Sequence, residues 1–344
     1  MDLDGDGIET EGSQAAPLFD HNGDAIKTGT GWLKPDDGWL VLDRDGNGTI
    51  DSGSELFGVN TVKKNGFLAR DGFDALADFD TNNDHQIDAN DAVFTRLLVW
   101  RDLNQDAISQ ANELMSLAAL KIKAIQVQAV SPTQWLGDGN SLSASASFFR
   151  LDGSEGTVSN LELATDVFQR VFTMPIARSN DAAFLPELRG SGRVRDLAEA
   201  ISLSPDLAKI VKRYVALSGR QEQIDSLDEF IESWAATSEM KSLRMQASEH
   251  AAHGTTLQYR FDGIQDDTNE FGVFLKKLGV VERFMGFTYR SGRGQISTEN
   301  IRDEERNLII SFSARQTENI VMAYERFKSD IYESLLPMTR KRRQ

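Results

Sequence analysis

The sequence predicts an α+β protein with two domains, and three observations carry this prediction. Five short acidic loops crowd the first 113 of the 344 residues. The stretch that follows alternates apolar and polar residues, as a small antiparallel sheet does. Beyond residue 185, apolar residues recur at helical spacing instead. We therefore expect one domain over residues 1–174 and a second, mainly α-helical domain over residues 185–344.

The acidic loops have the form Asp-x-(Asp/Asn)-x-(Asp/Asn), and they begin at Asp2, Asp20, Asp43, Asp80 and Asp102. We name them loops 2, 20, 43, 80 and 102 and number positions from the first Asp. Ca²⁺ is a hard cation that takes six to eight oxygens, and alternate short side chains in a tight loop supply three of them. Five such loops favour irregular EF-hand-like calcium loops, with Ca²⁺ as the cofactor.

The charge of the chain supports the same division. The first 113 residues carry 19 Asp and 4 Glu against 4 Lys and 4 Arg, a net −15 of the total −16. Repulsion on this scale opposes a compact state unless cations neutralise it. The same charge argues against nucleic acid as a partner.

A complete twelve-residue calcium loop also needs a carboxylate at position 12 that can bind through both oxygens. Loops 80 and 102 have Asp91 and Glu113 there, and loop 43 has Glu55 one residue late. Loop 2 has only Glu9 or Glu11 to close it. Loop 20 has no carboxylate of its own after Asp24, so we expect it to be the least secure unless Asp36 and Asp37 fold back as its missing ligands.

Position 6 of such a loop calls for glycine because the turn there is sharp. Loops 2 and 43 have Gly7 and Gly48, whereas loops 20, 80 and 102 have Ala25, His85 and Ala107. A residue other than glycine at positive φ costs about 1–2 kcal/mol. We therefore expect the last three loops to bind more weakly than loops with glycine.

The complete set of candidate calcium ligands follows from these positions and includes the residues at position 7. They are Asp2, Asp4, Asp6, Glu9, Asp20, Asn22, Asp24, Asp36, Asp37, Asp43, Asp45, Asn47, Thr49, Asp51, Glu55, Asp80, Asn82, Asp84, Gln86, Asp88, Asp91, Asp102, Asn104, Asp106, Ile108 and Glu113.

Short helices are expected between some of these loops, because the loops follow one another too closely for complete helix-loop-helix units. Phe67, Phe73, Leu76 and Phe79 form an apolar helical stripe before loop 80. The segment 92–100 shows helical spacing as well. We expect it to form one short helix between loops 80 and 102.

After Glu113 the period changes to that of strands. Residues 122–130 are typical of a strand with one irregularity, and residues 142–151 alternate before the turn signal Asp152-Gly153. Residues 157–163 would return as the partner strand. The sequence thus predicts a small antiparallel sheet over 117–165, packed on the acidic loops.

Residues 175–185 are interpreted as a linker, and helices are expected beyond it. Ser204 and Pro205 form a helix start, with Ser as the cap and Pro at the first helical position. Three further apolar stripes lie at 227–234, 271–278 and 320–335. Such stripes are more often core than ligand pocket, and they indicate no chemistry.

Other chemistries find little support. The chain has no Cys, and His250 and His253 have neither a third His nor a His-Glu-x-x-His pattern beside them. The glycine turns at 190–193 and 291–294 lack the lysine and spacing of a phosphate loop. We find no apolar run long enough to span a membrane and no signal peptide at the amino terminus. We expect either an intracellular protein or export by a route not read from the amino terminus.

Several strings, in order, closely resemble the calcium-dependent self-processing module of iron-regulated RTX proteins. They are DLDGDGIET (2–10), FDHNGD (19–24), TGW (30–32), PDDG (35–38), DSGSELFG (51–58) and VWRDLNQD (99–106). The resemblance covers residues 2 to about 170. Residues 185–344 are similar to the helical stretch that follows such modules in large secreted RTX-type proteins.

The resemblance implies cleavage of an Asp-Pro bond just ahead of the module, triggered when Ca²⁺ folds it. The Asp side chain would attack its own carbonyl to give an anhydride, which water or a lysine amine then opens. All seven prolines of this chain follow a residue other than Asp. The glycine-rich nonapeptides of RTX proteins are missing too, so we expect a fragment or a relic of such a protein.

The sequence therefore predicts a calcium-binding module of a bacterial protein exported by type I secretion, secreted or held at the cell surface. Whether it is an enzyme stays open, because the scissile bond is absent and no catalytic residue is assigned. Another protein or a cell surface is a candidate partner. The alternatives are a dockerin-like interaction module, since paired acidic loops about 22 residues apart occur there, and a cytosolic calcium sensor, which would need a Met-rich groove.

Overall fold

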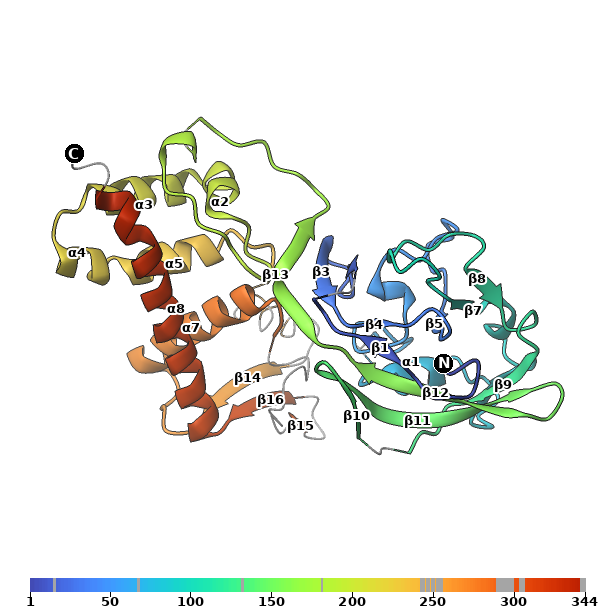
Figure 1. Ribbon diagram of the computed structural model, residues 1–344. Coiled ribbons are helices and arrows are strands. Elements are labelled where there is room, and N and C mark those ends of the chain that lie inside the picture. Colours follow the sequence, from blue (N-terminus) through green and yellow to red (C-terminus); the bar gives the residue numbers. More distant parts are fainter. Residues whose placement is uncertain are drawn as a thin grey trace. The chain divides into compact units, whose positions relative to one another are not determined.

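The computed structural model describes residues 1–344 except 15–16, 67–68, 131–132, 181, 242–244, 246–247, 249–250, 252–255, 289–299, 303–306 and 341–344. The chain divides into two compact units, Met1–Met174 and Pro175–Gln344. The first unit is built from short strands, loops and antiparallel sheets, and the second mainly from helices (Figure 1). The α+β class expected from the sequence is confirmed.

The largest sheet of the first unit is built around a long hairpin. Its two strands are β11 (Asn140–Arg150) and β12 (Glu155–Glu162), joined by the predicted turn, in which Gly153 has a φ of 89°. The other strands of this sheet are β6 (Gln86–Asp88), β9 (Ile122–Gln126) and β10 (Gln134–Gly137). Since β6 is the end of loop 80, this sheet incorporates an acidic loop directly.

Three smaller antiparallel sheets complete the unit. They consist of β1 (Thr10–Glu11) with β4 (Trp32–Leu33); β2 (Leu18–Phe19) and β3 (Ile26–Thr30) with β13 (Thr165–Phe172); and β5 (Trp39–Val41) and β8 (Leu114–Ser116) with β7 (Leu98–Trp100). Strand β3 follows the acidic core of loop 20, and β8 follows Glu113 at the end of loop 102. The acidic loops are thus anchored by strands more than by helices.

The helix expected over 92–100 is wrong. This segment forms only one 3-10 turn, η2 (Phe94–Arg96), and then strand β7, which pairs with β5 on one side and β8 on the other. Leu97, Val99 and Trp100 are all fully buried, so consecutive side chains face apolar surroundings on both faces of the strand. Helical spacing cannot be distinguished from such a doubly buried strand in so short a run.

The helix expected before loop 80 forms as a short α1 (Gly72–Ala77). Asp71 caps it by accepting from the Asp74 N–H at 2.8 Å, and Phe73 and Leu76 are buried. Phe67 lies outside the described residues. A second short element, the 3-10 helix η1 (Gly53–Glu55), follows loop 43.

The helices of the second unit are α2 (Leu197–Leu203), α3 (Pro205–Ala216), α4 (Arg220–Asp225), α5 (Leu227–Ala235), α7 (Asn269–Met285) and α8 (Ala314–Arg340), with a 3-10 turn η3 (Ala182–Phe184) before them. A helix lies at each of the four stretches that the sequence predicts, which are α3, α5, α7 and α8, and the unit also contains α2 and α4, which the sequence analysis did not single out. Ser204 caps α3 by accepting from the Leu207 N–H, as its sequence predicts. The residues interpreted as a linker pack in part, because Ala182 and Leu185 are buried in the core of this unit.

The second unit also contains a sheet that the helical expectation missed. Strands β14 (Thr256–Phe261) and β16 (Asn307–Phe312) are parallel neighbours, and β15 (Asn300–Arg302) pairs antiparallel with β16. Figure 1 shows this sheet beside α7 and α8. Its core cluster includes Leu257, Phe261 and Ile310. The apolar residues of these strands alternate over short runs only. The sequence analysis did not recognise them because longer helical stripes lie on both sides.

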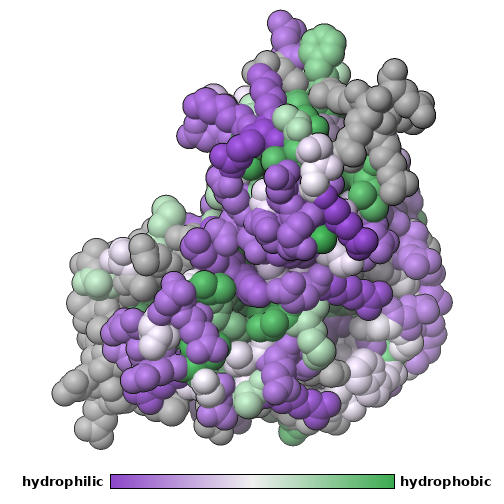
Figure 2. Space-filling model, turned by 90° about the vertical axis from the view of Figure 1, so that its left-hand side faces the viewer, coloured by the Kyte–Doolittle hydropathy of each residue, from purple (hydrophilic) through white to green (hydrophobic). Residues whose placement is uncertain are grey.

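One face of the molecule is largely polar. Figure 2 shows one face of the molecule on which hydrophilic residues dominate and apolar ones gather only in small groups. None of the helices in the described part combines the length and apolar character that a membrane crossing requires.

Candidate metal centres

All five acidic loops share one backbone conformation. The residues at positions 4 and 6 have positive φ in every loop, between 52° and 112°. These residues are Gly5 and Gly7, Gly23 and Ala25, Gly46 and Gly48, Asn83 and His85, and Gln105 and Ala107. The prediction of positive φ at position 6 is confirmed, including at the three residues that are not glycine.

The first Asp of the loop holds this turn with its side chain. In loops 20, 43, 80 and 102, its Oδ2 accepts from the N–H at position 6, at 2.8 to 3.0 Å. In the same four loops, the side chain at position 5 accepts from the N–H at position 7. In these four loops the turn is thus held by the loop's own side chains.

Loops 43, 80 and 102 each have a buried closing carboxylate. Glu55, Asp91 and Glu113 are all only 2% exposed. Each accepts hydrogen bonds from the backbone N–H groups at positions 2 and 9 of its own loop. Although Glu55 stands one residue later in sequence than the other two, it meets the same two N–H groups, because η1 brings it back over the loop.

Burial of these carboxylates affects their pKa values. Desolvation raises the pKa of Glu55 despite the N–H groups of Asp51 and Arg44. Desolvation also acts on Asp91, but hydrogen bonds from the Thr81 N–H and hydroxyl outweigh it, so the pKa of Asp91 is below its ordinary value. A buried carboxylate is costly unless it is paired or binds a cation.

Loop 43 concentrates acidic oxygens most clearly. One carboxylate oxygen each from Asp43, Asp45 and Glu55 lies within 4.8 Å of the others. These oxygens come from positions 1, 3 and 13 of one loop and are hard ligands, which suit a hard divalent cation. Loop 43 therefore fits Ca²⁺ by the chemistry and placement of its donors.

Loop 102 is embedded in an aromatic core. The Trp32 indole N–H donates to Asp102 Oδ2 at 2.7 Å, and the Trp100 indole donates to Glu113 Oε2 at 3.3 Å. Both indoles are fully buried, and Ala107 packs in the same cluster. Sequence reasoning missed these two donors. Trp100, two residues before the loop, could have been noticed, whereas Trp32 is 70 residues away.

Loops 43 and 102 are linked at position 8. The Ile50 N–H of loop 43 donates to the Ser109 hydroxyl of loop 102 at 2.6 Å. The pair is separated by 59 residues. Loop 80 is instead linked to the large sheet, since Ile87 at its position 8 pairs with Ile125 of β9.

Loop 20 has no closing carboxylate and is held by a neighbouring segment. The Asp20 carbonyl accepts from the Gly53 N–H at 2.7 Å, and Asn22 accepts from the Asn60 side chain at 3.2 Å. The expectation that Asp37 folds back onto loop 20 is wrong. The structure places a carboxylate oxygen of Asp37 within 4.8 Å of those of Asp2 and Asp4 in loop 2.

Asp37, and not Glu9 or Glu11 as the sequence suggested, is therefore the carboxylate that lies beside loop 2. Glu9 takes part through its backbone N–H, which donates to Asp37 Oδ2 at 2.9 Å, while its side chain lies 3.9 Å from Lys34. Asp37 is 2% exposed, and burial raises its pKa to about 6.

The remaining candidates have structural roles or fall outside the described residues. In the turn at 190–193, the Ser191 hydroxyl donates to the Phe284 carbonyl and the Arg193 N–H donates to the Arg283 carbonyl. This turn thus caps the end of α7. His250, His253 and the turn at 291–294 are not among the described residues.

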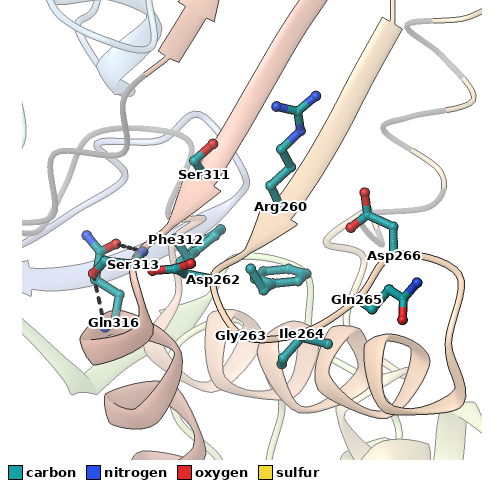
Figure 3. Close-up of a pocket in the computed structure, with 11 residues that line it drawn as sticks. Arg260, Asp262, Gly263, Ile264, Gln265, Asp266, Ser311, Phe312, Ser313 and Gln316 are labelled. Carbon is teal, nitrogen blue, oxygen red and sulfur yellow. Dashed lines mark hydrogen bonds between the residues drawn. The ribbon is translucent and has the colours of Figure 1, made fainter.

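The second unit contains an open pocket of about 690 Å³ at the carboxyl ends of β14 and β16 (Figure 3). Arg260 and Ser311 line it from paired positions on the two strands, and Asp262 and Asp266 from the loop after β14. Gln316 of α8 lies at its edge and accepts from the Ser313 N–H. Because its lining is largely exposed and carries charges of both signs, the pocket defines no particular ligand.

Comparison with known proteins places the first unit. Residues 1–164 match the family model of the SPM domain. The chain is 45% identical over 239 residues to the iron-regulated protein FrpA of Neisseria meningitidis serogroup C. This alignment covers 69% of the chain and 21% of the relative, so the chain spans about a fifth of that protein.

Proposed function

Because residues 1–164 belong to the SPM domain family, found in iron-regulated RTX proteins, we propose that this chain is a calcium-binding module that completes its folding when it binds Ca²⁺. The cations occupy loops 43, 80 and 102. The observation that carries this proposal is the shared closure of these loops by a carboxylate that is 2% exposed. Such carboxylates, together with the concentrated negative charge, destabilise the metal-free state.

Calcium stabilises the module because it binds the folded loops better than the unfolded chain. Loops of this kind in extracellular proteins bind Ca²⁺ at roughly 10⁻⁴–10⁻³ M. A module of this affinity stays empty where Ca²⁺ is scarce and fills where it is plentiful. We propose that the protein acts outside the cell after type I secretion, as relatives of the iron-regulated RTX kind suggest.

The activity that the family suggests is Ca²⁺-triggered cleavage of an Asp-Pro bond ahead of the module. No Asp-Pro bond occurs within this sequence. We therefore propose that this chain supplies the calcium-dependent scaffold of the reaction. The dockerin-like alternative is less favoured, because the acidic loops are built into a unit with several antiparallel sheets and a mainly helical unit follows them.

The test is calcium binding by the full chain, measured by calorimetry and far-UV circular dichroism after treatment with EGTA. We expect two or more bound ions and a gain of structure. Glu55→Gln should lose one ion, because it removes a buried carboxylate from the three-carboxylate cluster of loop 43. Glu162→Gln, the same change on an exposed residue of β12, is the control. An unchanged spectrum without binding heat at millimolar Ca²⁺ would refute the proposal.

A further inference from the structure

The first residue of the chain extends the edge of a sheet. Strand β5 is the outer strand of the sheet that it forms with β7 and β8, and Gly38 directly precedes it. The Met1 amino group donates to the Gly38 carbonyl at 2.7 Å, and the Gly38 N–H donates to the Met1 carbonyl at 3.1 Å. Two residues that exchange both hydrogen bonds form a hydrogen-bonded pair of an antiparallel ladder. Met1 therefore runs antiparallel to the chain that enters β5.

The outer edge of β5 has an unpaired position next to Met1. Alternate residues of an antiparallel strand direct their N–H and C=O groups to the same edge. Gly38 directs them to Met1, and the Leu42 N–H donates on the same side to the Glu55 carbonyl at 2.9 Å. Leu40 lies between these two residues, so its N–H points to this edge as well, where the described residues provide no acceptor for it.

This unpaired stretch is short and has a defined register. Val41 forms an antiparallel bridge with Leu56, so the edge is covered again from that residue onward. Only Trp39 and Leu40 lie between this bridge and the pair formed by Met1. In an antiparallel continuation from Met1, the residue directly ahead of it faces Trp39, and the second residue ahead faces Leu40 and exchanges hydrogen bonds with it.

The next residues of the chain are held from the opposite side. The Asp2 N–H donates to the Thr157 carbonyl of β12 at 2.9 Å, and the Arg150 guanidinium of β11 donates to the Leu3 carbonyl at 2.8 Å. Met1 itself is only 4% exposed, and the hydrogen bond of its amino group is buried. A peptide N–H in place of this amino group makes the same bond without bringing a charge into the interior.

We propose that a peptide segment joined ahead of Met1 adds to β5 as a short antiparallel strand, with its last residue opposite Trp39 and the residue before that opposite Leu40. Main-chain hydrogen bonds provide the attraction in such strand addition, so the pairing requires no particular side chains. The inference deepens the proposed function, because the added strand fixes the place of a cleavable bond ahead of the module. It rests on that function only for this role.

The test joins a short extension of alternating threonine and alanine ahead of Met1 of the full chain and uses NMR in saturating Ca²⁺. Hydrogen exchange of the Leu40 amide should slow by roughly two- to tenfold, which is the effect of one hydrogen bond of ordinary net strength. A nuclear Overhauser effect should join the Hα atoms of Trp39 and of the residue directly ahead of Met1, because the Cα atoms of such a pair are about 4.5 Å apart. The Leu278 amide of α7 is the reference and should exchange as before.

Two matched proline variants of the extension test the register without changing the chain itself. Proline in the second place ahead of Met1 should abolish both signals, because it has no N–H and its ring faces the Leu40 carbonyl. Proline directly ahead of Met1 should preserve them, because the N–H that it lacks points away from β5. The proposal is wrong if the extension changes neither signal or if both prolines act alike. Calcium titration of the unextended chain tests the proposed function separately, because it reports on the acidic loops and not on this edge.

Discussion

In each acidic loop, the residue at position 6 determines how much backbone strain the loop carries. Ala25, His85 and Ala107 all adopt the left-handed conformation that glycine adopts freely. The structure separates the three by environment. Ala107 is 3% exposed and packs in the aromatic core, whereas His85 is exposed. Relief of strain at Ala107 is therefore offset by the loss of a buried methyl group, which is worth about 0.8 kcal/mol.

We expect His85→Gly to tighten the binding of Ca²⁺ to loop 80 by about five- to thirtyfold, because it relieves about 1–2 kcal/mol of strain. Ala107→Gly should tighten binding at loop 102 less. Ala89→Gly is a matched control in the same loop, at a residue without positive φ. Calorimetric titration of the three variants tests the order. Equal or weaker binding by His85→Gly would show that position 6 does not limit affinity.

The first Asp of loops 43 and 20 should contribute in different ways. Asp43→Ala should cost more bound Ca²⁺ than Asp20→Ala, because loop 43 has Gly48 and a closing carboxylate and loop 20 has neither. Asp20 is 6% exposed and holds the N–H groups of Asp24 and Ala25. Its loss should therefore lower the melting temperature of the metal-free chain more. Equal losses of bound Ca²⁺ in the two variants would contradict this ranking.

At the scale of elements, the second unit is held by a polar link between α5 and α8. Asp228 of α5 accepts from the Tyr324 hydroxyl at 2.7 Å and from Lys328 Nζ at 2.9 Å, both on α8. Desolvation acts to raise the pKa of Asp228, but these hydrogen bonds outweigh it and the pKa lies below its ordinary value. The ionised form of Asp228 thus stabilises the contact between the two helices.

The sign of this shift gives a pH dependence. A carboxylate whose pKa is lowered by folding stabilises the protein above its unfolded pKa of about 3.9, and this stability is lost as pH falls through the folded value. We expect Asp228→Asn to lower stability between pH 5 and 7 and to differ less from the unmodified chain below about pH 4. Asp225→Asn, on the exposed end of α4, is the control. Urea unfolding across this pH range is the measurement, and a difference that stays constant would contradict the assignment.

At the scale of the whole molecule, cleavage depends on a bond that the sequence does not contain. The cleavage proposed above requires a carboxyl group poised against its own carbonyl and a proline leaving group, and in that proposal the module contributes position and electrostatics. Met1 and Asp2 are fixed by backbone hydrogen bonds to Gly38 and Thr157. A segment joined there would therefore begin from a defined place in the fold.

We expect a graft that ends Asp-Pro-x-x-x before Asp2 to be cleaved when Ca²⁺ is added, giving a fragment with a new amino-terminal proline. Mass spectrometry of the products identifies the bond. Asp→Ala at the grafted residue should abolish cleavage, and the ungrafted chain should stay whole. A graft that folds with Ca²⁺ yet remains uncleaved for days would mean that this copy is a structural calcium module only.

The sequence by itself determined the features that depend on neighbours along the chain. The five acidic loops, the positive φ at their sixth position and the hairpin turn at Asp152-Gly153 all arise from local backbone geometry and local hydrogen bonds, which short motifs encode. The helix start at Ser204-Pro205 is local for the same reason. These features could be read without knowing what packs against them.

Tertiary structure decided the features that depend on distant partners. It made residues 98–100 a strand, because β5 and β8 supply hydrogen-bond partners that the apolar pattern does not reveal. Asp37, considered from the sequence as a ligand for loop 20, lies beside Asp2 and Asp4 of loop 2. The Trp32 indole donates a hydrogen bond to Asp102, which is 70 residues away in the sequence. Carboxylate oxygens converge only after strands far apart in sequence have paired, so spacing along the chain can propose ligands but cannot group them into sites.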